Sequence, residues 1–270
     1  MLKIVLMDKQ INIVETLDWY LWAGVDEICA DKVCLSENLE KKPAISYNSI
    51  SKVTVQNTLS RPVHSNSTNL TALKNARDIC AKVETLDELK SVMLAFDGCN
   101  LKDTAASTVF GDGSATAKIM LIGEAPGADE DRIGLPFVGR CGRLLDKMLA
   151  AIGFNRKECY ITNVLPWRPP GNRTPTDDEI AVCLPFLKRQ IELIHPDIIL
   201  LLGGIALKAV MDCSDSISRT RGKWLEYSVE NKNIQVLATY HPSYLLRSSA
   251  QKAKAWTDLL RLKRKIDELK

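Results

Sequence analysis

Apolar residues recur along most of the chain in blocks that predict strands, each followed by a helix. The runs Ile119–Ile122 and Ile198–Leu202 contain no polar position, as expected of strands buried on both faces. The predicted strands are Lys118–Gly123, Cys159–Leu165, Asp197–Leu202 and Gln235–Tyr240, and the predicted helices are Gly142–Ile152, Thr176–Ile194, a short one after Gly204 and a last one from about Ser249. This order predicts an α/β fold of three layers, α/β/α, around a mostly parallel four-stranded sheet.

The first third of the chain has a different pattern. An amphipathic stretch from about Asn12 to Ala23 predicts a short helix. Residues 36–75 are rich in Ser, Asn, Thr and Lys, a composition that buries too little apolar surface to fix a structure. Thr85 and Glu88 have the spacing of a capping box, which predicts a helix from there. We therefore expect an N-terminal helical segment (1–35), a disordered polar linker (36–75) and a catalytic domain (80–270).

Composition narrows the class of protein. The 270 residues are 46% hydrophobic and 26% charged, with a formal net charge of +3, so any nucleic-acid contact depends on locally placed cations. The eight cysteines form no CxxC pair, and no signal segment or membrane-length apolar run is present. We expect a cytoplasmic protein without disulfides, with no membrane partner.

Two polar segments follow predicted strands and therefore meet at the carboxyl edge of the sheet, where open α/β folds bind ligands. The first is Gly123–Gly127 with the acidic residues after it, and the second is the loop His241–Arg247. The first segment lacks the ending of a phosphate-binding Walker loop and the later glycines of a dinucleotide fingerprint. It is a candidate site, with an ordinary strand-to-helix turn as the alternative.

Three side chains near this edge are candidates for binding a flat heterocycle. Phe137 lies between glycines and a proline, which hold its ring on a loop, and it either stacks on a base or covers the core. Asn163 ends a strand, and its amide either complements an imide edge such as that of uracil or bonds local backbone. His241 is the histidine placed at this edge.

Two further segments suit contacts with DNA. The loop Pro166–Pro175 is predicted to be ordered but not helical, and it carries Arg168, Asn172 and Arg173. After His241, the residues Leu245, Leu246 and Arg247 combine apolar bulk with a cation, as in a wedge that keeps a flipped base out of the stack. Taken alone, the leucine pair is also typical of core.

Five ordered motifs together resemble the family 4 branch of the uracil-DNA glycosylase superfamily over roughly Leu89 to the end of the chain: GEAPGADED, GLPFVG, YITN, RPPGNRTP and HPSYLLR. The resemblance implies hydrolysis of the bond between uracil and deoxyribose in DNA, without a metal or nucleotide in the chemistry. It also implies that Phe137 stacks on the flipped uracil, that Asn163 binds N3–H and O4, and that His241 donates to O2.

The resemblance leaves the water-orienting group open. Ala125 stands where family 1 enzymes carry an Asp, and Gly127 stands where they carry a Tyr, so both are expected to line the uracil pocket. Glu124 and Glu130 match acidic positions of the motif. We expect Glu124 to organise the pocket and Glu130 to act on the water or the sugar cation, with Asn172 as a further candidate at the rim.

Members of family 4 usually hold a [4Fe–4S] cluster through four cysteines. The matching positions here are Phe96, Cys99, Trp167 and Cys183, so two of the four ligands are missing. We therefore expect no cofactor and no metal.

The expected partner is uracil-containing DNA, single- or double-stranded, and the abasic product would pass to downstream repair enzymes. We expect a monofunctional, turning-over, monomeric enzyme that acts in a bacterial-type cytoplasm with the nucleoid. The alternatives are a non-catalytic DNA-binding or polymerase-associated module, and a glycosylase with a broader range of deaminated bases.

Overall fold

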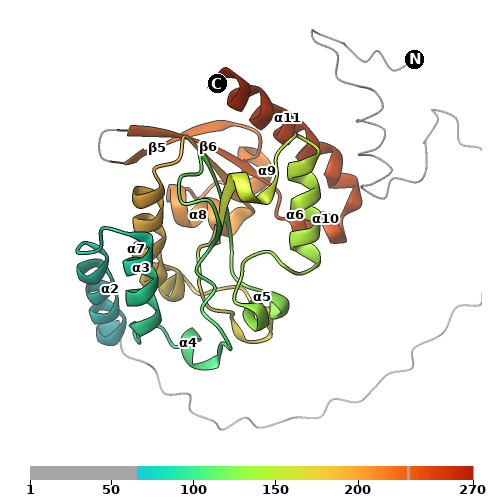
Figure 1. Cartoon of the computed structure of the whole chain (residues 1–270). Coiled ribbons are helices and arrows are strands. Elements are labelled where there is room, and N and C mark those ends of the chain that lie inside the picture. Colours follow the sequence, from blue (N-terminus) through green and yellow to red (C-terminus); the bar gives the residue numbers. More distant parts are fainter. Residues whose placement is uncertain (1–65, 230–231, 270) are drawn as a thin grey trace, which may run out of the picture.

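The computed structural model describes residues 66–229 and 232–269, which form an α/β fold with a central sheet covered on both faces by helices (Figure 1). The helix expected over 12–23 lies outside the described residues. None of the described helices is both long and apolar enough to cross a membrane.

The sheet has six strands in the order β1-β3-β2-β4-β6-β5. The four expected strands pair in parallel at its centre, and the two edge strands pair antiparallel to them. The strands are β1 (Asp112–Gly113), β2 (Ile119–Gly123), β3 (Cys159–Asn163), β4 (Ile198–Leu202), β5 (Trp224–Val229) and β6 (Lys232–Thr239). The expectation of four strands is thus too low, because the two-residue β1 and the partly exposed β5 have no continuous apolar run.

Side chains of the central strands alternate between two cores. Met120 and Ile122 of β2 face the core beneath α7 and α8, whereas Ile119 and Leu121 face the core beneath α6 and α11. The helices are α2 (Asn66–Cys80), α3 (Leu86–Ala95), α4 (Leu101–Thr104), α5 (Ala128–Ile133), α6 (Arg140–Ala150), α7 (Asp177–Ile194), α8 (Gly204–Met211), α9 (Ile217–Thr220), α10 (Pro242–Arg247) and α11 (Lys252–Glu268). Three short 3-10 turns complete the described elements: Arg156–Glu158, Pro170–Asn172 and Ser249–Gln251.

The last part of the expected linker is helical. Helix α2 begins at Asn66 and packs against α7, so residues 66–75 are helical and not disordered as expected, whereas residues 36–65 of the expected linker lie outside the described residues. Its buried face consists of Ala72, Ala76 and Cys80, three small residues at helical spacing. The capping box that begins α3 is present as expected, with the Glu88 backbone N–H donating to Thr85.

The carboxyl edge of the sheet is shaped by one close approach. Gly123 of β2 pairs in register with Asn163 of β3. A Cβ atom at Gly123 would lie 2.4 Å from the Asn163 amide oxygen and 2.5 Å from the Phe137 ring. Glycine is therefore required for both side chains to reach this edge.

Candidate functional site

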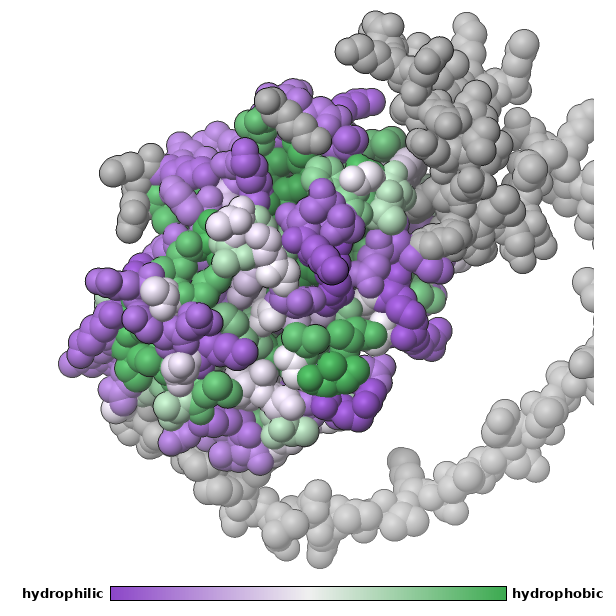
Figure 2. Space-filling model, in the orientation of Figure 1, coloured by the Kyte–Doolittle hydropathy of each residue, from purple (hydrophilic) through white to green (hydrophobic). Residues whose placement is uncertain are grey.

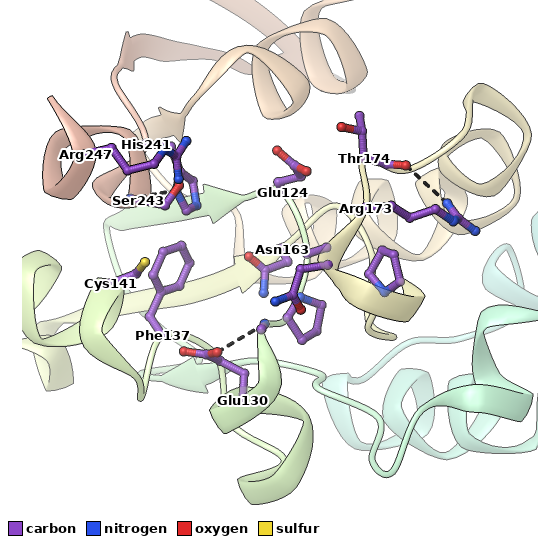
Figure 3. A pocket seen from close by; sticks show the side chains of 15 residues that line it. Glu124, Glu130, Phe137, Cys141, Asn163, Arg173, Thr174, His241, Ser243 and Arg247 are labelled. Carbon is purple, nitrogen blue, oxygen red and sulfur yellow. Dashed lines mark hydrogen bonds between the residues drawn. The ribbon is translucent and has the colours of Figure 1, made fainter. Parts of the chain in front are cut away.

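A cavity of about 430 Å³ opens at the carboxyl edge of the sheet. Figure 3 shows that side chains from the β2–α5 loop, the Phe137 loop, the end of β3, the loop before α7 and the start of α10 point into it. The expected residues Glu124, Ala125, Gly127, Glu130, Phe137, Asn163, Asn172, Arg173, His241 and Arg247 all line it. The chain therefore brings together residues more than 120 positions apart.

The Phe137 loop is held in an unusual backbone conformation. Phe137 has a φ of 53°, and its ring is 4% exposed beside the His241 ring, with 5.7 Å between the centroids and 34° between the planes. Arg156 donates to the carbonyl oxygens of Pro136 and Phe137, the latter at 2.9 Å, and pairs with Asp112 at 2.6 Å. The Arg156 guanidinium thus holds Phe137 in the left-handed backbone conformation, which is unfavourable for a residue other than glycine.

Asn163 offers an unused acceptor to the cavity. The residue is 5% exposed, and its buried amide oxygen has no hydrogen-bond partner among residues 66–229 and 232–269. An orphaned buried acceptor costs about 1–3 kcal/mol, so such a group is retained where a ligand supplies the donor. The geometry suits a ligand whose N–H reaches this oxygen.

His241 is oriented by the helix that it caps. Its Nδ1 accepts a hydrogen bond of 3.1 Å from the backbone N–H of Ser243, and the Ser243 hydroxyl lies 2.8 Å from the same nitrogen. Burial, together with the positive charge of Arg247, lowers the pKa of His241 to about 4. The ring is therefore neutral near pH 7, and its proton is on Nε2.

The segment from His241 to Arg247 is not the loop that we expected. Pro242 to Arg247 form α10, with proline at the first helical position and the His241 side chain as N-cap. Leu245 is 1% exposed in the core, whereas Tyr244 and Leu246 are 36% and 39% exposed. The helix therefore buries one of the two leucines expected to contact DNA and presents the other to solvent.

The two candidate carboxylates differ in their surroundings. Glu130 is 8% exposed and accepts from three backbone N–H groups, those of Gly127 (3.1 Å), Val138 (3.0 Å) and Gly139 (2.8 Å). One of its oxygens would lie 2.7 Å from a Cβ at Gly127, so the carboxylate fills the space beside that glycine. Glu130 thus joins the two loops of the cavity wall, a role different from the expected action on water.

Glu124 has no such bonds. In the part of the chain that the structure describes, its carboxylate makes no hydrogen bond or ion pair, and burial raises its pKa. Figure 3 places it at the cavity, on the far side of Asn163 from Glu130. Glu124 is therefore the carboxylate that is available to a ligand or a water molecule.

The loop before α7 supplies the arginines at the rim. It contains the 3-10 turn Pro170–Asn172, although we expected no helical turn there. Arg168 donates to Asn172 at 2.7 Å and lies 4.0 Å from Asp131, while Arg173 makes two bonds to Glu179, of 2.9 and 2.6 Å. Arg173 lines the cavity, whereas Arg168 does not line it and reaches its wall through the bond to Asn172. Both guanidiniums keep further N–H donors.

Exposed apolar side chains lie at the end of α5 and just after it. Figure 2 shows a hydrophobic patch over α5, bordered by hydrophilic surface. Ile133, at the end of α5, is 46% exposed, and Leu135 is 40% exposed. This patch was not predicted from the sequence, because two apolar residues at and just after the end of a six-residue helix carry no periodic signal.

The residues present do not suit an iron–sulfur cluster. Cys99 and Cys183 lie together, with 3.9 Å between their sulfurs. The other two positions are filled by Phe96, packed edge-on against Phe186 at 5.1 Å, and by Trp167, which is fully buried. The Trp167 indole donates to Thr108 at 2.9 Å. Among the described residues, these positions thus supply two of the four cysteine ligands that such a cluster needs, and two packed aromatic rings occupy the rest of the space.

Sequence reasoning missed several supporting residues. Ser243 orients His241, Arg156 holds the Phe137 loop, and Thr174 and Cys141 line the cavity. The spacing His-Pro-Ser at a helix start offers a signal for Ser243, since N-cap side chains bond the N–H two or three residues later. Arg156 has no local signal, because its partners are 10 to 44 residues away.

Comparison with known proteins gives consistent matches. Residues 110–260 match the Uracil DNA glycosylase superfamily. A type-4 uracil-DNA glycosylase of Archaeoglobus fulgidus is 43% identical over 168 residues, 61% of this chain and 84% of that protein. A type-4 uracil-DNA glycosylase of Thermotoga maritima is 44% identical over 151 residues, which cover 56% of this chain and 77% of that protein. A DNA polymerase of Bacillus phage SP01 is 32% identical over 148 residues, which cover 54% of this chain and 16% of the polymerase.

Proposed function

Since the chain belongs to the uracil-DNA glycosylase superfamily, we propose that it removes uracil from DNA by hydrolysing the bond between N1 of the base and C1′ of the deoxyribose. The observation that carries the proposal is the unpartnered amide oxygen of Asn163, buried beside an aromatic ring and a neutral histidine. An imide N–H is the donor that this oxygen lacks.

Binding of the base follows from the side chains of the cavity. The ring of Phe137 stacks on the flipped uracil, while the Asn163 amide accepts from N3–H and donates to O4. Cytosine carries an acceptor at N3 and a donor at the neighbouring position. It would face Asn163 with both groups reversed, which disfavours it by about 1–3 kcal/mol.

His241 stabilises the departing base. As the bond between N1 and C1′ breaks, its electron pair passes to uracil, and negative charge develops on O2. The neutral ring, with its proton on Nε2, donates a hydrogen bond to that oxygen without transferring the proton. A fixed donor of this kind stabilises the transition state more than the ground state.

We assign to Glu124 the role of orienting the water molecule that attacks C1′. Its carboxylate makes no other bond in the described chain, so it can orient a water molecule toward C1′ and stabilise the sugar cation. A bond forms from the water oxygen to C1′, and the proton that water loses passes through the carboxylate to solvent. The uracil anion takes a proton from solvent.

The DNA would lie across the mouth of the cavity. Leu246 and Tyr244 are the exposed apolar side chains of α10 that can fill the gap left by a flipped base, while Leu245 belongs to the core. Arg168, Arg173 and Arg247 suit the phosphates around it. The product is an abasic site, which needs downstream repair enzymes, and the place of action is the compartment that holds the DNA.

The proposal includes an enzyme without an iron–sulfur cluster. Its support is the packing of Phe96 and Trp167 at two of the four ligand positions. Protein purified without oxygen should show no visible absorbance and no stoichiometric iron. Iron at four atoms per chain would overturn this part of the proposal without touching the glycosylase assignment.

The test of the function is alkali-revealed strand cleavage of single-stranded, U·G and U·A oligonucleotides, with a matched thymine substrate. The wild-type protein should cleave the uracil substrates alone, and His241→Ala should lower the rate sharply. Binding without base release would instead support a DNA-binding module, a second candidate that the match to a segment of a phage DNA polymerase favours. Release of hypoxanthine or xanthine at a comparable rate would broaden the substrate range.

A further inference from the structure

A run of cations leads away from the uracil cavity along α6 and toward the start of α11. Arg140, Arg143 and Lys147 are three and four positions apart on α6, so they share one face of the helix, and all three are exposed. We call these three residues, together with Lys252 of α11, the basic band.

The band begins at the mouth of the cavity. Cys141 lines the cavity, and the charges of both Arg140 and Arg247 act on its thiol. Helix α10, which ends at Arg247, packs against α6. The band is therefore continuous with the residues already assigned to the rim.

Like charges are held together at the other end of the band. Burial and the neighbouring Lys147 lower the pKa of Lys252. The two side chains are therefore near enough for their positive charges to act on each other.

The nearby acidic side chains have other partners. Asp129 lies 3.7 Å from Arg132, and Asp146 lies 3.1 Å from Arg156. In the part of the chain that the structure describes, Arg140 and Arg143 have no ion-pair partner. With a net charge of only +3 for the whole protein, this concentration of positive charge is local.

We propose that the basic band binds the phosphate backbone of the DNA strand that flanks the uracil, as an extension of the binding surface beyond the cavity. The inference rests on the proposed function. Arg140 and Lys147 are about 10 Å apart along the helix axis at about 1.5 Å per residue, a length that spans about three nucleotides at about 3.4 Å each. A polyanion with regularly spaced charges therefore fits the band in both sign and length.

The test compares the variant Arg143→Gln/Lys147→Gln with Lys82→Gln/Lys90→Gln. The control removes the same charge at exposed positions by α3, which lies on the opposite side of the sheet from α6 (Figure 1). Binding to a thymine oligonucleotide is measured across a salt series, and KM and kcat are measured on a long uracil oligonucleotide and on one too short to reach the band. Thermal unfolding checks that both variants are folded.

The band variant should lower the slope of log K against log salt by about 1.4–1.8 for two lost phosphate contacts. On the long substrate its KM should rise on the order of tenfold at low salt with kcat unchanged, and on the short substrate neither should change. Slopes equal to the control, or equal losses on both substrates, would overturn the inference. If the wild-type protein released no uracil from any substrate, the proposed function itself would fail, whereas the thymine binding data would still report on the band.

Discussion

Ser243 donates its backbone N–H to Nδ1 of His241 at 3.1 Å, and this bond determines which ring nitrogen of His241 carries the proton. The same bond caps α10, so the fold of the helix and the orientation of the ring depend on one contact. Because Nδ1 is the acceptor, Nε2 is left as a donor for a ligand. The hydrogen bond that caps α10 thus also sets the tautomer of His241, the side chain that we propose to donate to O2 of the leaving uracil.

Replacing His241 with Asn should remove the donor to O2 while keeping the cap, since Asn is among the best N-cap residues. We expect kcat for uracil release to fall by about 10²–10³ with little change in KM, because the bond strengthens in the transition state. Single-turnover kinetics would measure this. Ser243→Ala is the matched control: it keeps the backbone N–H, so it should retain most of the activity. Equal losses in both variants would contradict the assignment.

The low pKa of His241 also makes folding stability depend on pH. The folded-state pKa of about 4 lies below the ordinary value of 6.5, so the folded protein disfavours the protonated ring. The associated stability is fully present above about pH 6.5 and is lost as pH falls through about 4, with a total of up to roughly 3 kcal/mol. Denaturant unfolding at pH 7 and pH 4 should show this loss in the wild-type protein and not in His241→Asn. Parallel pH profiles for the two proteins would refute it.

We expect Glu124 to be needed for activity and Glu130 for stability. Glu124→Gln should lower kcat by about 10²–10⁴, the range for a group that assists proton transfer, without lowering stability, since burial already disfavours its charge. Glu130→Gln should instead lower the free energy of unfolding by about 1.5–3 kcal/mol, because three N–H groups lose a charged acceptor. Kinetics and denaturant unfolding of both variants test this. If Glu130→Gln lowered kcat and Glu124→Gln lowered stability, Glu130 would be the residue that orients the water.

Much of the fold was predictable because the four parallel strands are buried on both faces. Such strands are continuous apolar runs, and the polar residues after them fall at one edge of the sheet. Asn163 and His241 follow from the same pattern, whereas Phe137 was predicted from the glycines and the proline around it. The structure brings all three side chains to one cavity.

What the sequence did not predict depends on contacts between distant residues or on small side chains. The edge strand β1 is two residues long and pairs with β3 some 50 residues later. The buried face of α2 is made of alanine and cysteine, so a polar composition concealed a packed helix. The role of Glu130 needed the positions of three backbone N–H groups, which no local motif specifies.

Replacing Asn163 tests the proposed function most directly. In the absence of a ligand its buried amide oxygen lowers the stability of the protein, and in the complex it would bind the base. Its buried amide oxygen has no donor in the described part of the chain, so Asn163→Ala should leave the free energy of unfolding unchanged or raise it by about 1 kcal/mol, within the usual cost of an orphaned acceptor. The same variant should lower kcat/KM for uracil release by about 10- to 200-fold, equivalent to about 1–3 kcal/mol.

The neighbouring residue Thr162 is a control of the opposite kind. Its hydroxyl is buried and donates to the Phe110 carbonyl at 2.8 Å, and the same carbonyl accepts from the Gln190 amide at 2.9 Å. Thr162→Val should therefore lower stability by about 0.5–1.5 kcal/mol, the net contribution of the one hydrogen bond that it removes. Its effect on kcat/KM should be smaller than that of Asn163→Ala, since its hydroxyl is bonded within the protein. Thermal unfolding and steady-state kinetics of the two variants would decide. If Asn163→Ala lost stability as Thr162→Val does and kept its activity, Asn163 would be a structural residue, and the observation that carries the proposed function would be lost.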